Sequence, residues 1–132
     1  MKKICIVVGS RANYSSIKST MQAIKEHKEL NLMLVLCASA VLERFGELES
    51  QIKNDGFKIS EKIYTLIDGG NPVTMAKSTG LGLIELTSVF ENKKPDLVIT
   101  VGDRFETMST VLAAAYMNIP IAHTMGGEVT GT

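Results

Sequence analysis

The chain has 132 residues, a length that suits one domain with a single core and is short for a two-domain enzyme. Its 14 Lys and Arg residues balance 14 Asp and Glu residues, and neither sign is gathered into a tail. This balance gives no electrostatic reason to expect nucleic acid or an anionic membrane as a partner.

Apolar stretches and cysteines indicate the compartment. No apolar stretch approaches the length needed to span a bilayer, and the run after Lys2 and Lys3 is too short for a signal peptide. Cys5 and Cys37 stand in apolar surroundings without metal-type spacing, so we expect buried free thiols. We therefore expect a soluble cytoplasmic protein, and nothing in the sequence requires a metal or redox cofactor.

Short apolar runs alternate with longer helical patterns along the chain, which is typical of β–α–β units in a parallel sheet. The predicted strands are 3–8, 31–36, 58–66, 97–101 and 119–123. The predicted helices are 14–29, a weaker one through 42–52, 73–93 and one that follows the fourth strand.

Apolar spacing also predicts which side of each helix faces the core. Asn13 is the expected N-cap of the first helix, and Gly80 and Gly82 weaken the middle of the third. The predicted inward-facing residues of the three stronger helices are Ile17, Met21 and Ile24, then Met75, Leu83, Leu86 and Phe90, then Met108, Val111, Leu112 and Ala115.

Five parallel strands with right-handed crossovers most often assemble in the order 3-2-1-4-5, which predicts an α/β, Rossmann-like sheet with helices on both faces. In that order the first and fourth strands are neighbours whose connections leave in opposite directions. Ligands bind at such a switch point. The loops that carry Arg11, Asp103 with Arg104, and 126–128 are therefore expected to flank one crevice.

The segment 98–107 has the clearest functional signal, because its apolar run ends at Gly102 and charged residues follow at once. Charge at the carboxyl end of a buried strand stands where a substrate binds in such sheets. Arg104 is either a surface cation or a residue whose planar guanidinium binds a diphosphate. Asp103 is either an acid or base, or the N-cap of the next helix in a capping box with Glu106.

Further candidates lie in the other two loops. Arg11 stands between a strand and a helix, where backbone amides favour an anion, and Ser15 either contacts a ligand or satisfies the backbone. His123 is a structural residue or a ligand contact, and Glu128 is an exposed loop residue or a functional one. The first loop lacks the glycine patterns of nucleoside triphosphate and dinucleotide sites, so a nicotinamide cofactor is not expected.

At these residues the chain resembles the UDP-N-acetylglucosamine 2-epimerases of the hydrolysing, sialic-acid-pathway type. The resemblance runs from residue 3 to the end and rests on the segments 10–15, 102–105, 116–119 and 123–132. It implies the N-terminal one of two Rossmann-like domains that face each other across a cleft, an arrangement called GT-B. It further implies that residues 1–132 alone are inactive, that a C-terminal domain completes the site, and that the enzyme is a homo-oligomer.

The resemblance implies removal of the C2 proton from UDP-N-acetylglucosamine or a di-acetamido relative, with loss of UDP and formation of a glycal. Water then adds, or UDP returns in the non-hydrolysing branch. By residue match, Arg11, Ser15 and Arg104 contact the UDP portion, His123 belongs to the substrate site, and Asp103 is a catalytic acid or base.

The chain departs from the family pattern at three positions on this edge. Met125 stands in place of a glutamate, Asn13 in place of an acid and Ala40 in place of a histidine. Methionine cannot transfer a proton, so Glu128 is the nearest carboxylate that could replace the missing one. The alternatives are a non-catalytic sugar-nucleotide-binding protein and a flavodoxin-like interaction domain.

Overall fold

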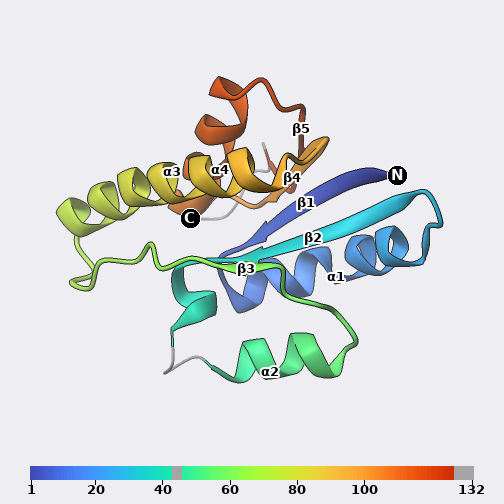
Figure 1. Ribbon diagram of the computed structural model, residues 1–132. Helices are drawn as coiled ribbons and strands as arrows, with labels where there is room; N and C mark the ends of the chain where they lie inside the picture. Colours follow the sequence, from blue (N-terminus) through green and yellow to red (C-terminus); the bar gives the residue numbers. More distant parts are fainter. Residues whose placement is uncertain (43–45, 127–132) are drawn as a thin grey trace.

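The computed structural model describes residues 1–42 and 46–126, which form one parallel sheet with helices on both faces (Figure 1). The sheet has five strands in the order β3-β2-β1-β4-β5, and every neighbouring pair is parallel. This order is the one that the sequence predicted. The strands are β1 (Lys2–Val8), β2 (Leu30–Leu36), β3 (Glu61–Lys62), β4 (Leu97–Val101) and β5 (Ile121–Thr124).

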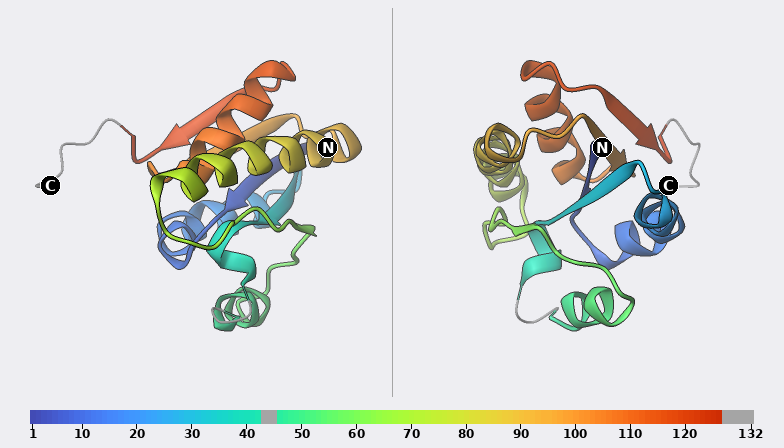
Figure 2. Two further views of the ribbon diagram at one scale, coloured as in Figure 1. Left: turned by 90° about the vertical axis from the view of Figure 1, so that its left-hand side faces the viewer. Right: turned by 45° about the vertical axis from the view of Figure 1, so that its right-hand side comes forward.

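Two helical layers enclose the sheet, one on each face. Helices α1 and α2 cover one face, while α3 and α4 cover the other (Figures 1 and 2). The helices are α1 (Arg11–Glu26), the 3-10 helix η1 (Ala38–Val41), α2 (Glu47–Asn54), α3 (Pro72–Lys93) and α4 (Phe105–Tyr116).

Alternate residues of the central strands supply two separate cores, because successive side chains of a strand point to opposite faces. Ile6 and Leu34 join the core beneath α1, whereas Val7 and Val35 join the core beneath α3 and α4. The predicted inward face of α1 is confirmed, since Ile17, Met21 and Ile24 are all buried.

The third strand is much shorter than predicted. Instead of covering 58–66, it consists of Glu61–Lys62, which pair with the end of β2. The backbone amides of Ser60 and Ile63 extend this contact by donating to Leu34 and Leu36. Strand β3 lies at the edge of the sheet, where a short strand with charged side chains limits pairing with other chains.

The inward face predicted for α4 is wrong. Met108 is 56% exposed and Ala115 is exposed, while the buried residues are Glu106, Ser109, Thr110, Ala113 and Ala114. Small side chains face inward because α4 packs closely against α3. A Cβ on Gly82 of α3 would lie 2.8 Å from Ser109 Oγ. Met75 of α3, also predicted to be inward, is 50% exposed.

Helix α1 begins three residues earlier than predicted, and its N-cap is Ser10 rather than Asn13. The Ser10 hydroxyl accepts a hydrogen bond from the Asn13 amide at 3.2 Å. The Asn13 side chain is instead buried, and its Oδ1 accepts from the Gly9 amide at 3.1 Å. This arrangement makes a very short connection between β1 and α1, which places Arg11 in the first helical turn.

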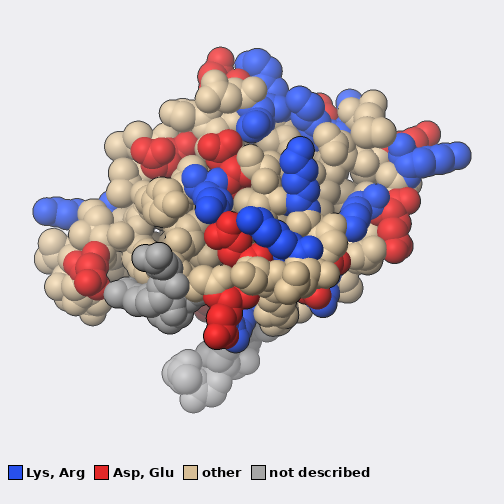
Figure 3. Space-filling view, turned by 60° about the horizontal axis from the view of Figure 1, so that its bottom comes forward, with Lys and Arg blue, Asp and Glu red and all other residues tan. Residues whose placement is uncertain are grey.

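Charges of both signs are mixed over the surface. On the face drawn in Figure 3, cationic and anionic side chains alternate, and neither forms a continuous field. Among residues 1–42 and 46–126, no helix is both long and apolar enough to cross a membrane.

Candidate functional site

Three loops leave the same edge of the sheet. Strand β1 pairs with β4 in parallel, with Ile6 opposite Ile99, and β4 pairs with β5, with Val101 opposite Thr124. Because the strands are parallel, the loops that follow β1, β4 and β5 emerge together at their carboxyl ends. This is the edge on which the sequence placed its candidate residues.

Arg104 and Glu106 form an ion pair at the start of α4. Arg104 Nε donates to Glu106 Oε1 at 2.7 Å, and the two side chains are 50% and 5% exposed, respectively. The Arg104 guanidinium also lies 5.8 Å from the Phe105 ring centroid. The arginine is therefore held at its Nε edge while half of its surface remains open to solvent.

Asp103 does not cap α4, and the capping-box alternative is wrong. The N-cap of α4 is Arg104, and no side chain accepts a hydrogen bond from the helix at this position. The Glu106 carboxylate accepts from the side-chain Nε of Arg104 rather than from a backbone amide at the helix start. The Asp103 carboxylate is exposed and forms no hydrogen bond with any described residue. It is consequently available to a ligand at the edge of the sheet.

Arg11 and Ser15 lie at the N-terminal end of α1. The Arg11 guanidinium is 61% exposed and lies 3.8 Å from the carboxylate of Glu47, which begins α2. Such an exposed pair contributes little to stability, so Glu47 leaves Arg11 able to bind an anion. Ser15 is exposed on the next turn of the helix.

His123 stands at the end of β5 opposite Thr100 of β4. Its Nδ1 is 2.7 Å from the Thr100 hydroxyl, and a Cβ on Gly126 would overlap its ring. The hydrogen bond to Thr100 and the close approach of Gly126 orient the His123 ring. The residue is also exposed, and it lies near the carboxyl end of β5, so a substrate contact stays a prediction.

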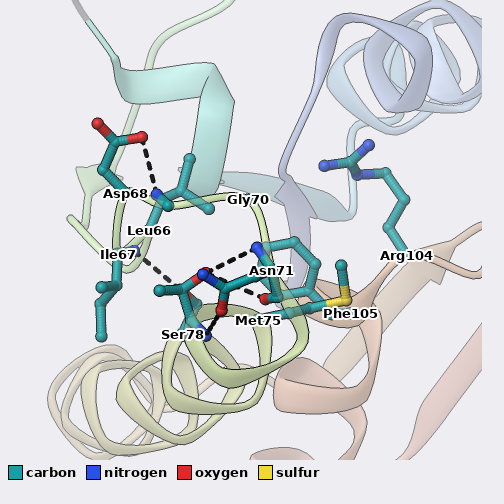
Figure 4. A pocket seen from close by; sticks show the side chains of 11 residues that line it. Leu66, Ile67, Asp68, Gly70, Asn71, Met75, Ser78, Arg104 and Phe105 are labelled. Carbon is teal, nitrogen blue, oxygen red and sulfur yellow. Dashed lines mark hydrogen bonds between the residues drawn. The ribbon is translucent and has the colours of Figure 1, made fainter.

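A pocket of about 210 Å³ lies between the segment after β3 and the start of α4 (Figure 4). Arg104 stands at one side of it and Asp68 at the other, with Phe105 and Met75 between them. The Ser78 hydroxyl accepts a hydrogen bond from the Ile67 backbone amide at 2.8 Å, and this bond fixes the loop that follows β3. Sequence reasoning did not anticipate this contribution from the third loop, because its strand was predicted to be longer.

The three positions that depart from the family pattern have different surroundings. Asn13 is committed to the Gly9 amide, and Ala40 is buried in η1. Met125 has a positive φ of 62° and is 50% exposed at the ligand edge. Glu128, the predicted substitute carboxylate, lies outside the described residues.

Glu106 is the residue at this edge whose importance the sequence reasoning missed. The pattern Asp-Arg-Phe-Glu suggested a cap, whereas the fold buries Glu106 next to the loop that follows β1. Burial, and then the negative charge of Glu106, raise the pKa of the Cys37 thiol. A glutamate on a helix face that is otherwise made of small residues was the available signal.

Comparison with known proteins gives a consistent result. A family model described as UDP-N-acetylglucosamine 2-epimerase matches residues 22–132. A Campylobacter jejuni relative named GDP/UDP-N,N'-diacetylbacillosamine 2-epimerase (hydrolyzing) is 33% identical over 129 residues, which are 98% of this chain and 33% of the relative. A Legionella pneumophila relative named UDP-N,N'-diacetylbacillosamine 2-epimerase (hydrolyzing) is 32% identical over 132 residues, which are 100% of this chain and 35% of that protein.

A solved structure described as UDP-N-acetylglucosamine 2-epimerase superimposes with a TM-score of 0.84, covering 99% of this chain and 35% of the other. At 24% identity, this likeness concerns the fold alone. The chain spans about a third of the length of the curated relatives it matches. Since the family model covers most of the sequence, the chain belongs to the UDP-N-acetylglucosamine 2-epimerase family.

Proposed function

We propose that this chain is the N-terminal domain of a UDP-sugar 2-epimerase with a GT-B architecture, in which a C-terminal domain completes the substrate cleft. The observation that carries the proposal is the placement of Asp103 and two arginines after the adjacent strands β1 and β4. An exposed carboxylate and two cations on loops at the same edge of the sheet fit a substrate that must lose a proton and release a diphosphate.

The proposed reaction removes the proton from C2 of the sugar while the bond between C1 and the diphosphate oxygen breaks. The electron pair of that bond leaves with UDP, and the sugar becomes a glycal. Water then adds a proton at C2 from the opposite side and a hydroxyl at C1, which yields the free 2-epimer. In the alternative, non-hydrolysing outcome, UDP returns to C1.

Each side chain has a proposed role. Asp103 acts as an acid or base, and Arg11 and Arg104 neutralise the charge that develops on the departing UDP. Guanidinium groups suit this task because they stay charged and present several donors to phosphate oxygens. Ser15 and His123 contact the substrate. Glu128 supplies the second carboxylate, because Met125 stands where the family pattern has a glutamate.

The substrate class follows from the names of the relatives. The Campylobacter and Legionella proteins are both named for UDP-N,N'-diacetylbacillosamine. We therefore place a UDP-di-acetamido sugar first and UDP-N-acetylglucosamine second, in the synthesis of bacterial surface polysaccharide or sialic acid. A cytoplasmic location fits the two cysteines, Cys5 and Cys37, which are both free and buried.

The test is to incubate the full-length protein with either UDP-sugar in deuterated water, then measure free UDP and deuterium at C2. Both signals are expected from the wild type. Asp103→Asn should reduce turnover by about 10²- to 10⁴-fold while leaving stability unchanged, because its carboxylate has no partner in the described structure. Glu128→Gln should also reduce turnover, and undiminished activity would remove Glu128 from the mechanism.

One observation favours a second candidate, a sugar-nucleotide-binding protein without catalysis. Met125 stands at the ligand edge where the family resemblance places a glutamate, and a thioether cannot transfer a proton. UDP-sugar binding to the full-length protein with neither UDP release nor deuterium incorporation, for both sugars, would favour this candidate over the enzyme.

A further inference from the structure

Burial of the Glu106 carboxylate in α4 is energetically unfavourable, and helix formation does not require a glutamate there. The residue is 4% exposed, and its Oε2 has no hydrogen-bond partner within the described residues. A buried carboxylate with an unsatisfied oxygen carries a desolvation penalty that alanine would avoid. Among the described residues, the one polar partner of its carboxylate is Arg104, whose Nε donates to Oε1 at 2.7 Å.

The neighbouring strand leaves room for this glutamate. A Cβ on Gly9, which follows β1, would lie 2.5 Å from Glu106 Cγ and 2.7 Å from Oε1. The backbone of Gly9 does not adopt the left-handed conformation that favours glycine. Glycine is therefore needed at this position for space rather than for its backbone angles, and the space is filled by Glu106.

The contact leaves the outer edge of the arginine unoccupied. Glu106 engages Nε alone, and the terminal nitrogens of Arg104 form no hydrogen bond or ion pair with a described residue. A guanidinium presents five donors in a rigid plane, so fixing its Nε edge orients the remaining donors. The half-exposed side chain then directs those donors away from the buried carboxylate and toward the ligand edge.

We infer that Glu106 is a positioning residue, which together with Gly9 holds the Arg104 guanidinium in the orientation that binds the diphosphate of a UDP-sugar. This inference rests on the proposed function, because it assigns the oriented donors to that ligand. Glu106 acts through Arg104 and does not itself touch the substrate.

The experiment is a double-mutant cycle in the full-length protein, with UDP affinity measured by titration calorimetry and kcat and KM measured by UDP release. Glu106→Ala should weaken UDP binding by about 10- to 100-fold, by analogy with the loss of groups that orient the side chains of metal ligands. Glu106→Gln, which keeps an oxygen acceptor for Nε, should restore most of that affinity. Gly9→Ala should reproduce the effect of Glu106→Ala by displacing the glutamate.

The decisive comparison uses a background that lacks the arginine. In Arg104→Ala protein, adding Glu106→Ala should change UDP affinity by less than about twofold, because the residue through which Glu106 acts is gone. A merely structural role would lower stability and affinity equally in both backgrounds. Glu91→Ala is the matched control, since Glu91 is an exposed residue at the far end of α3 paired with Lys94.

The outcomes separate the inference from the proposed function. If the wild type binds no UDP, both fail. If it binds UDP and Glu106→Ala has unchanged affinity, or has the same effect with and without Arg104, the positioning role alone is overturned. An effect that depends on Arg104, with rescue by glutamine, supports it.

Discussion

Asn13 holds the turn between β1 and α1 from inside the protein. Its side-chain Oδ1 accepts a hydrogen bond from the buried backbone amide of Gly9, and its backbone amide donates to the Ser10 hydroxyl. Two short-range hydrogen bonds thus set the direction in which the chain leaves the sheet. Because Gly9 adjoins Glu106 and Arg11 follows Ser10, this turn also determines where two proposed site residues lie.

Asn13→Ala should therefore destabilise the protein. The change leaves the buried Gly9 N–H without its acceptor, which costs about 1–3 kcal/mol of the free energy of unfolding. Urea unfolding of the variant and the wild type measures the difference. Ser16→Ala, an exposed position on the same helix, should stay within about 0.5 kcal/mol of the wild type, and equal effects of the two changes would contradict this account.

At the scale of the elements, α3 and α4 are joined through small residues rather than through the large apolar ones. Gly82 of α3 faces Ser109 of α4, whose hydroxyl donates to the Thr79 carbonyl at 2.7 Å. At this point the Ser109 side chain fills the space beside Gly82, and no side chain larger than hydrogen fits at position 82 without displacing it. Small residues thus occupy the inward face of α4, and Met108 is left 56% exposed on another face of the helix.

The two glycines of α3 should respond in opposite ways to alanine. Gly80 has open space around its Cβ position, so Gly80→Ala should raise the free energy of unfolding by about 0.5–1 kcal/mol through better helix propensity. Gly82→Ala places a Cβ 3.0 Å from Ser109 Cβ and should lower it by about 1–3 kcal/mol. Urea unfolding measures both, and a stabilising Gly82→Ala would rule out the close contact.

Helices α1 and α2 are linked by a charged hydrogen-bond network. Tyr14 donates to Asp55 at 2.5 Å, and Lys18 Nζ lies 3.1 Å from the same carboxylate. Both contacts favour the ionised carboxylate, the Tyr14 hydrogen bond most, and they lower the pKa of Asp55 below its usual 3.8. Burial, followed by the hydrogen bond to Asp55, raises the pKa of Tyr14.

This network predicts a pH-dependent contribution to stability. Because the folded-state pKa of Asp55 is depressed, its contribution is complete above the unfolded value near 3.8 and is lost as pH falls toward the folded value. Asp55→Asn should therefore be less stable than the wild type at pH 7. The difference in the free energy of unfolding between the two proteins should decrease below about pH 4. Denaturant midpoints at pH 7, 5 and 3.5 test this, and a difference independent of pH would contradict it.

At the scale of the whole molecule, the sheet presents a row of loops at its carboxyl edge, and the face drawn in Figure 3 carries charges of both signs. The proposed substrate needs contacts on more than one side, and the curated relatives are about three times as long as this chain. We expect the nucleotide to lie between this edge and the proposed second domain.

Purified residues 1–132 should accordingly release no UDP from either UDP-sugar. The edge contributes Asp103 and the two arginines, but an open surface lets water compete with every one of these contacts. A UDP-release assay, with the full-length protein as the positive control, tests the prediction. Release by residues 1–132 at the full-length rate would show that one domain suffices.

The strand order could be predicted from the sequence because it depends on repeated local patterns and on the right-handed crossover rule. Strand β4 was predicted residue for residue, since Pro95 and Gly102 bound its apolar run on either side. Convergence of the first, fourth and fifth loops followed from that order alone. The family was also evident from residues 10–15 and 102–105.

Only the tertiary structure decided the details that depend on neighbours distant in sequence. The face of α4 was set by close packing on Gly82, which outweighs the apolarity of Met108. The sequence pattern indicated that Glu106 caps the helix locally. In the structure its side chain instead occupies the space beside Gly9, where it binds Arg104. Local patterns therefore determined the fold and the edge that carries the candidate site, whereas side-chain partners there depend on volumes and donors that only the folded chain brings together.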